Sequence, residues 1–230
     1  MIDLHCHILP GIDDGSKDPE TTRQMLEEQL RQGVQTIVAT PHFQGSKAFP
    51  REFLEKRAAA LQQVSNLEGD LPRIIPGAEV EYFFGMGNSE SLKDLQLGDS
   101  GLLLIEMPFC PWSQRMVEEV CSLKDRLGVT PVLAHVDRYR RRKQFPKYRE
   151  FMLKKGVLFQ CNASAFLSIR SRRWALQLLK KESIHFLGSD AHNLDTRAPN
   201  LDLAAQVIAK KLGPETMEKI TAFTAEMLKI

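Results

Sequence analysis

The chain has 230 residues and a formal net charge of +2, with 43% hydrophobic and 26% charged residues. This is the composition of a folded protein of one substantial domain, residues 1–230, and the near-neutral charge argues against nucleic acid or a membrane surface as the main partner. No apolar run approaches the ~20 residues that cross a bilayer, and the start carries no basic leader, so we expect no membrane insertion and no signal peptide.

The cysteines exclude one class of active site. They are Cys6, Cys110, Cys121 and Cys161, and they form no CxxC pair. We expect reduced thiols in a cytoplasmic protein. A cysteine-dependent phosphatase needs an arginine six positions after its thiolate. The residues at those positions are Ile12, Met116, Leu127 and Leu167, so the chain does not use that chemistry.

Short apolar runs alternate with longer amphipathic stretches along the whole chain. The expected strands are 1–5, 34–40, 73–82, 101–107, 131–136, 157–163 and 184–189. The expected helices are about 19–32, 50–65, 113–127, 146–155, 170–182, 201–212 and 214–228. The strand runs are rich in Val, Ile, Leu and Phe, as is typical of strands that are buried on both faces.

Seven strands with helices between most of them predict parallel β/α units. Such units form either an open sheet or a closed barrel. Functional-looking residues follow nearly every strand, whereas an open sheet gathers them at one switch point. We therefore predict an α/β fold with a closed, TIM-like barrel and a site at the C-terminal ends of its strands.

Polar residues recur at the ends of the expected strands. The stretch DLHCHILPGIDDG places His5 and His7 on one face of an extended chain. Later strands end in TPH, GAEVE, IEMP, LAH and GSDAH, which contribute His42, Glu79, Glu81, Glu106, His135, Asp190 and His192. Carboxylates in apolar surroundings are costly unless they are paired or bound to a cation. The recurrence favours a metal site over a set of unrelated core or turn residues.

Imidazoles mixed with carboxylates suit Mn²⁺, Fe or Zn²⁺ better than Ca²⁺. The candidate ligands are His5, His7, Asp14, His42, Glu79, Glu106, His135, Asp190 and His192. They are too many for one ion and suit two or three ions with bridging carboxylates. Three divalent ions against four carboxylates leave positive charge for a hydroxide and an anionic substrate, which favours a phosphate ester.

Taken together, these motifs resemble the polymerase-and-histidinol-phosphatase (PHP) superfamily of metallohydrolases. More narrowly, DLHCHILPGIDDGSKD, GVQTIVATPH, PVLAHVDRY and GSDAHNLDTR resemble the bacterial manganese-dependent tyrosine phosphatases of capsule and exopolysaccharide biosynthesis, the CpsB/CapC-like family. The resemblance is specific over residues 1–200 and less informative beyond. It implies a distorted seven-stranded barrel (the PHP fold) with three divalent ions, Mn²⁺ being favoured and Fe or Zn²⁺ the alternatives.

The resemblance also implies how the ligands are shared. The first ion would be held by His5, His7 and Asp190, with Glu79 bridging to a second ion that Glu106 and His135 complete. The third ion would be held by Asp14, His42 and His192. Asp14 rather than Asp13, and Glu79 rather than Glu81, match the family's ligands, a choice that spacing alone leaves open. Two arginines, Arg138 and Arg197, correspond to those that bind the phosphoryl group.

The activity implied is hydrolysis of phosphotyrosine on a protein by a metal-activated hydroxide. The partner would be a bacterial tyrosine kinase with a tyrosine-rich tail, and the role would be control of polysaccharide synthesis. Two other enzyme classes stay open, a small-molecule phosphatase such as histidinol phosphatase and a PHP phosphodiesterase. A non-catalytic regulatory module is disfavoured because all nine ligand positions are intact. The sequence assigns neither a general acid nor an oligomeric state.

The sequence leaves the role of two basic stretches and of two polar residues open. The basic stretches RYRRRKQ (138–144) and IRSRR (169–173) are either solvated loops or contacts for an acidic phosphopeptide. His185 lies early in the last strand, away from the catalytic end, so we expect a packing or surface role. Asn162 ends the sixth strand and could face the pocket, but we do not count it as a ligand.

Overall fold

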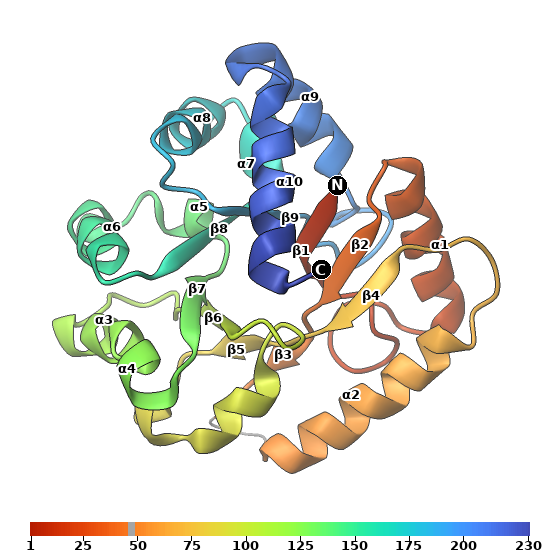
Figure 1. Ribbon diagram of the computed structural model, residues 1–230, viewed down its shortest axis with the longest axis horizontal. Helices are drawn as coiled ribbons and strands as arrows, with labels where there is room; N and C mark the ends of the chain where they lie inside the picture. Colours follow the sequence, from red (N-terminus) through yellow and green to blue (C-terminus); the bar gives the residue numbers. More distant parts are fainter. Residues whose placement is uncertain (46–48) are drawn as a thin grey trace.

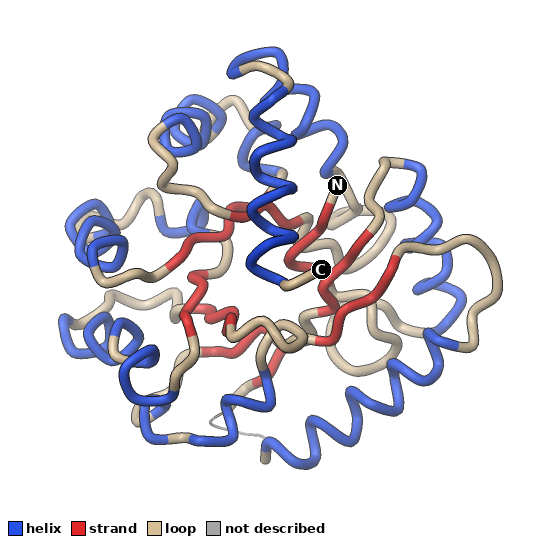
Figure 2. Tube along the Cα trace, viewed as in Figure 1, coloured by secondary structure: helices blue, strands red, loops and turns tan. Residues whose placement is uncertain are grey.

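The computed structural model describes residues 1–45 and 49–230, and all of its paired strands are parallel. A three-stranded sheet has the order β1 (Ile2–Cys6), β2 (Thr36–Ala39), β4 (Arg73–Pro76). A six-stranded sheet has the order β3 (His42–Phe43), β5 (Glu79–Glu81), β6 (Leu102–Glu106), β7 (Thr130–Leu133), β8 (Leu158–Asn162), β9 (Phe186–Gly188). The strands curl around the centre of the molecule, with helices outside them (Figure 2).

The helices follow the strands as β/α units require. They are α1 (Pro19–Arg31), α2 (Pro50–Ser65), α3 (Gln114–Cys121), α4 (Leu123–Leu127), α5 (Val136–Tyr139), α6 (Phe145–Lys154), α7 (Ser164–Leu167), α8 (Arg172–Lys180), α9 (Leu201–Leu212) and α10 (Glu215–Leu228), with 3₁₀ turns η1 (Met86–Asn88) and η2 (Glu90–Leu95). The cap of α1 is Asp18, whose side chain accepts a hydrogen bond from the Thr21 N–H. Within the described residues, none of the helices is long and apolar enough to cross a bilayer.

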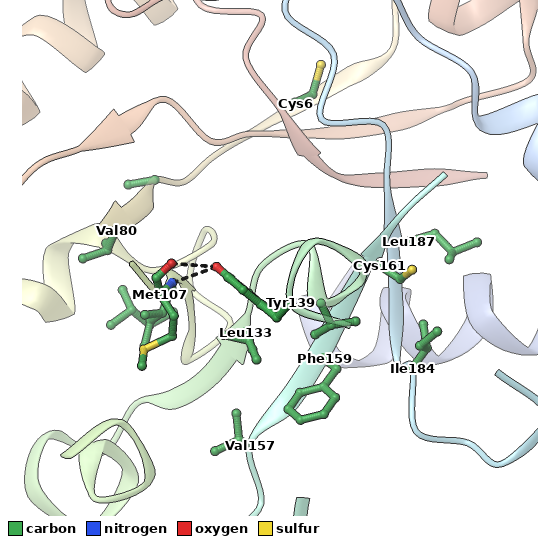
Figure 3. Close-up of a cluster of buried hydrophobic side chains, with 14 of the residues drawn as sticks. Cys6, Val80, Met107, Leu133, Tyr139, Val157, Phe159, Cys161, Ile184 and Leu187 are labelled. Carbon is green, nitrogen blue, oxygen red and sulfur yellow. Dashed lines mark hydrogen bonds between the residues drawn. The ribbon is translucent and has the colours of Figure 1, made fainter. Parts of the chain in front are cut away.

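Two apolar clusters fill the molecule. The inner one takes residues from the strands of both sheets and from α10, among them Leu4, Val38, Leu104, Val132, Phe186 and Leu228. The outer one lies between strands and helices, and part of it is shown in Figure 3. Helix α10 crosses the N-terminal ends of the strands (Figure 1), where Phe223 contacts His185 just before β9. This packing closes one end of the curled sheet and leaves the other end for a site.

The α/β class and the curled parallel sheet agree with the sequence prediction, but a single closed seven-stranded barrel is not confirmed. The expected strand 34–40 corresponds to β2 alone, and after a break the chain enters the other sheet as β3. The expected strand 73–82 is itself broken into β4 and β5, which belong to different sheets. Pro41 lies in the first break, where it has no N–H to give to a ladder. An isolated parallel bridge joins Cys6 at the end of β1 to Ala191, in the segment after β9.

A third expected strand, 131–136, is shorter than predicted. β7 ends at Leu133, and His135 takes a left-handed conformation with φ of 31° before α5 begins. A histidine in this conformation is uncommon, and the apolar pattern gives no sign of it. The turn carries the His135 side chain to the C-terminal edge of the sheet.

Candidate metal centre

The polar residues predicted at the strand ends lie at one edge of the curled sheet. They come from β1, β3, β5 and β6 and from the segments that follow β1, β7 and β9. Because the strands are parallel, the C-terminal ends of β1, β6, β7 and β9 lie side by side at that edge, where the short strands β3 and β5 begin with His42 and Glu79. His5, His7, Glu79, His135, Asp190 and His192 are all buried, whereas the Asp14 side chain is 65% exposed. The fold therefore gathers imidazoles and carboxylates from distant parts of the chain.

The first group is formed by His5, His7 and Asp190. The two imidazole Nε2 atoms are 3.0 Å apart, and each lies 3.6 Å from Asp190 Oδ1. Glu79 Oε2 is 3.3 Å from the Nε2 of His5 and 3.4 Å from that of His7. Two nitrogens and two oxygens thus converge on one point.

Neighbouring side chains fix the tautomers of these two imidazoles. The Nδ1–H of His5 donates to Gln160 Oε1 at 3.3 Å, and that of His7 donates to Asp13 Oδ2 at 2.8 Å. With Nδ1 protonated, each neutral ring directs the lone pair of Nε2 toward the other ring. Lone pairs at this separation repel one another unless a proton or a cation lies between them. The residues present therefore fit a bound metal ion.

Glu79 lies at the middle of a second group, with His42 and Glu106. Its Oε2 is 3.0 Å from His42 Nδ1, and its Oε1 is 2.9 Å from His135 Nε2. His135 Nε2 is also 3.1 Å from Glu106 Oε1. Burial alone would raise the pKa of Glu79, but the surrounding imidazoles, His5 first, hold it well below its usual value. The carboxylate stays ionised and offers an oxygen to each side.

The third group joins His7, Asp14, His42 and His192. Asp14 Oδ1 lies 3.4 Å from His42 Nε2 and 3.5 Å from His192 Nε2. The Nδ1–H of His192 donates to the Asp190 carbonyl at 3.0 Å, and its buried Nε2 has no hydrogen-bond partner among residues 1–45 and 49–230. Burial, and then the charges of His7 and Arg197, lower the pKa of His192 to about 4. A neutral, unpartnered imidazole nitrogen is the form that binds a metal.

Two arginines contact Asp190, and one of them, Arg197, also lies beside the third group. Arg138 donates to Asp190 Oδ2, while Arg197 donates to Asp190 Oδ1 at 2.9 Å and lies 3.5 Å from Asp14 Oδ2. Their side chains are 32% and 34% exposed, far more than the ligand side chains that they contact apart from Asp14. Guanidinium groups at the solvent side of such a centre could donate hydrogen bonds to an incoming anion.

Similarity to known proteins agrees with this geometry. The family model "Capsular polysaccharide synthesis, CpsB/CapC" matches residues 1–229. The chain belongs to the CpsB/CapC family. It is 33% identical to the tyrosine-protein phosphatase YwqE of Bacillus subtilis (strain 168), over 99% of this chain and 91% of that protein. It is 31% identical to the tyrosine-protein phosphatase CpsB of Streptococcus pneumoniae, over 96% of this chain and 94% of that protein.

The fold is also similar to a solved CpsB/CapC structure. Crystal structures of YwqE from Bacillus subtilis and CpsB from Streptococcus pneumoniae are described as those of unique metal-dependent tyrosine phosphatases. The match to one of these chains has a TM-score of 0.86 and 29% sequence identity, and it covers all of this chain and 94% of the solved one. The shared fold extends over the whole length described above.

All nine residues predicted as ligands lie at this centre of the CpsB/CapC chain, but their grouping differs in part from the prediction. His7 belongs to two groups, and the group around Glu79 takes in His42, while His135 contacts the two carboxylates of that group. Glu81 belongs to none of the three groups found in the described part of the chain. Asp13, the alternative to Asp14, instead accepts hydrogen bonds from the His7 imidazole and from the N–H groups of Gly15 and His42.

Sequence reasoning missed the residues that support the ligands. Gln160 Oε1 accepts from the His135 N–H at 2.6 Å as well as from His5, and its amide donates to Asn162, which in turn donates to Asp190. A glutamine within the apolar run VLFQCN was the available signal. Asp3 is fully buried and accepts from the N–H groups of His5 and Ser189, so it ties β1 to the segment after β9.

The remaining ambiguous residues mostly have structural contacts. His185 accepts a hydrogen bond from the Phe159 N–H and packs beside Phe223, away from the centre. In the basic stretches, Arg142 donates to the Cys110 carbonyl and Arg172 to the Phe166 and Leu167 carbonyls. These arginines stabilise loops, which leaves the neighbouring charges for any contact with substrate.

Proposed function

We propose that this CpsB/CapC protein is a metal-dependent phosphatase that hydrolyses phosphotyrosine in a protein substrate. The observation that carries the proposal is the convergence of five imidazoles and four carboxylates at one edge of the sheet, with two arginines beside them. The relatives named tyrosine-protein phosphatases support the choice of substrate. The exclusion of a cysteine nucleophile supports the choice of chemistry.

The ligand assignment is part of the proposal. His5, His7 and Asp190 would hold one ion, Glu79 and Glu106 with His135 a second, and Asp14, His42 and His192 a third. The shared position of Glu79, whose two oxygens face different imidazoles, supports a bridging role. Donors of this kind suit Mn²⁺, and Fe or Zn²⁺ would suit them as well.

The residues of the chain have separate tasks in the reaction. Bound divalent ions lower the pKa of a coordinated water and neutralise charge on the phosphoryl oxygens. Arg138 and Arg197 would donate charge-assisted hydrogen bonds to the same oxygens. Asp13 and Gln160 hold the imidazoles of His7 and His5 in the required tautomer. The leaving phenol has a pKa of about 10, so it needs less help from a general acid than an alcohol does.

We further propose a single domain over residues 1–230 and a cytoplasmic setting, with a bacterial tyrosine kinase as the phosphorylated partner. The four free cysteines support a reducing compartment. Residues from both sheets pack together in one inner cluster. This supports one distorted seven-stranded barrel, in which β2 and β3 are two parts of one interrupted strand and β4 and β5 are two parts of another.

The test is phosphate release from a phosphotyrosine peptide and from histidinol phosphate, by chelator-treated protein with and without restored Mn²⁺. We expect metal-dependent hydrolysis of the peptide and little release from histidinol phosphate. His135→Ala should abolish turnover and reduce bound metal, whereas His185→Ala, a histidine outside the centre, should keep both. The reverse substrate preference would point to a small-molecule phosphatase, and full activity without metal would contradict the mechanism.

A further inference from the structure

The loop after β6 presents an exposed aromatic ring to the metal centre. Phe109 is 58% exposed, although it lies only three positions after Glu106. Its ring is nearly parallel to the His135 imidazole, with an interplanar angle of 18° and a centroid distance of 6.1 Å. The Phe109 side chain therefore lies beside the candidate ligands while one part of it faces solvent.

Buried aromatic residues hold this loop on both sides of Phe109. The Tyr139 hydroxyl donates to the Met107 carbonyl at 2.8 Å and accepts from the Met107 N–H at 3.0 Å, as Figure 3 shows. The Trp112 indole N–H donates to the Pro108 carbonyl at 2.9 Å, and Arg142 donates to the Cys110 carbonyl. The backbone on both sides of Phe109 is thus tied to the protein, which fixes the point from which its ring projects.

Three buried aromatic rings form a layer next to Phe109, but Phe109 itself is not buried in it. Trp112 packs edge-on against Tyr139 with centroids 4.7 Å apart and against Phe145 at 5.9 Å, and these three rings are buried. Phe109 touches only the edge of this layer, 5.9 Å from Tyr139. An exposed phenyl ring lacks the favourable free energy that burial would give it. An apolar group of a substrate that covers the ring would supply that free energy.

Other exposed aromatic rings do not share this position. Phe84 is 66% exposed, but the Arg115 guanidinium lies 4.3 Å from its ring centroid. Within the part of the chain that the structure describes, Phe109 is the exposed phenylalanine whose ring lies against a candidate ligand. The position of Phe109 therefore suits contact with the substrate group that is bonded to the phosphoryl group.

We propose that Phe109 is the specificity residue that selects aryl phosphates, and that it does so by packing against the ring of phosphotyrosine. The inference rests on the proposed function. With the phosphoryl group among the ligands and the arginines, the tyrosyl ring leaves the centre alongside Phe109. Aromatic rings attract one another in offset or edge-on arrangements at centroid distances of about 4.5–7 Å. Phosphoserine has no ring, so it gains nothing from this contact.

The test compares Phe109→Ala and Phe109→Tyr with Phe84→Ala, an exposed phenylalanine whose ring lies against Arg115. Substrates are a phosphotyrosine peptide and the same peptide with phosphoserine. We expect Phe109→Ala to lower kcat/KM for phosphotyrosine by about tenfold, mainly through KM, because a stacked pair contributes up to about that factor. Hydrolysis of phosphoserine and the content of bound metal should not change, and Phe109→Tyr and Phe84→Ala should behave like wild type.

Inhibitor binding supplies a second readout that needs no turnover. Phe109→Ala should weaken inhibition by phenylphosphonate by a similar factor and leave inhibition by methylphosphonate unchanged. Equal losses for both peptides or both phosphonates would overturn the inference, since Phe109 would then only support His135. A wild-type enzyme that hydrolyses aliphatic phosphates but no phosphotyrosine would overturn the proposed function and this inference with it.

Discussion

Asp13 contacts the candidate metal centre through His7. Its Oδ2 accepts from His7 Nδ1 at 2.8 Å and from the His42 N–H at 3.0 Å, and its Oδ1 accepts from the Gly15 N–H at 2.9 Å. Burial would raise the pKa of Asp13, but the hydrogen bond and charge of His7 lower it to about 2. A methyl group at Gly15 would lie 2.2 Å from the His7 carbonyl, so glycine lets this loop close around the imidazole.

Asp13→Asn should weaken metal binding without removing a ligand. The amide oxygen could still accept from His7, but the variant loses the negative charge that makes the imidazole Nε2 a stronger ligand for a metal ion. We expect metal affinity to fall about tenfold or more, as is usual for partners of ligating histidines. Asp18→Asn is the matched control, since the exposed Asp18 side chain caps α1 by accepting from the Thr21 N–H. Competition with a metal-sensitive dye measures both, and equal affinities in the two variants would contradict this role.

Metal binding should weaken as the pH falls. Burial disfavours the charged forms of His5, His7 and His135, yet neighbouring carboxylates raise the pKa of all three above the ordinary value in the metal-free chain. A metal ion must displace these protons, so affinity is high above the raised pKa values and decreases through and below them. We expect bound Mn²⁺ at about pH 8 and its release near pH 5, below the ordinary histidine value. Elemental analysis after gel filtration measures this, and equal metal content at both values would contradict it.

At the scale of elements, the junction of β1, β8 and β9 sets the position of His5. A Cβ atom at Gly188 would lie 2.6 Å from the Cβ of His5 and 2.8 Å from Gln160 Nε2. Both neighbours are buried and hydrogen-bonded, so neither can move away easily. Close packing here is what keeps the imidazole of His5 facing that of His7.

Gly188→Ala should therefore lower both stability and metal affinity. Overpacking of this kind costs about 1–3 kcal/mol of the free energy of unfolding. In Gly87→Ala, the new Cβ atom would lie 3.3 Å from the flexible Arg126 side chain, so that variant should remain close to wild type. Denaturant unfolding and metal titration of both variants provide the comparison. A Gly188→Ala protein as stable as the control would show that the junction can relax.

The positions of most elements could be predicted from the sequence, because apolar runs and amphipathic stretches follow from burial. The breaks could not. Nothing in the run 73–82 reveals that its halves pair in different sheets, since pairing depends on distant strands. The end of β7 was missed because His135 has φ of 31°, and Asp190, with φ of 54°, shares this conformation. Both are candidate ligands, and backbone strain of this kind is concentrated at functional sites.

At the scale of the whole molecule, the two ends of the curled sheet have different roles. Helix α10 covers the N-terminal ends of the strands, and the candidate ligands lie at the C-terminal ends. The gathering of these candidate ligands could be predicted because histidines and carboxylates at the ends of apolar strands are otherwise costly. The hydrogen bonds that Asp13 and Gln160 accept from the imidazoles could not be predicted. An aspartate in a turn and a glutamine in a strand are common for local reasons, and only the fold shows that each lies beside an imidazole.

The most direct measurement is a titration of the metal-free protein with Mn²⁺, in which bound metal and phosphate release from a phosphotyrosine peptide are followed together. We predict no turnover in the metal-free protein and activity that rises with bound metal until it levels off at two to three ions per chain. Activity that reaches its maximum before any metal is bound, or metal binding that brings no hydrolysis of phosphotyrosine, would contradict the assignment of this centre as a metal-dependent tyrosine phosphatase site.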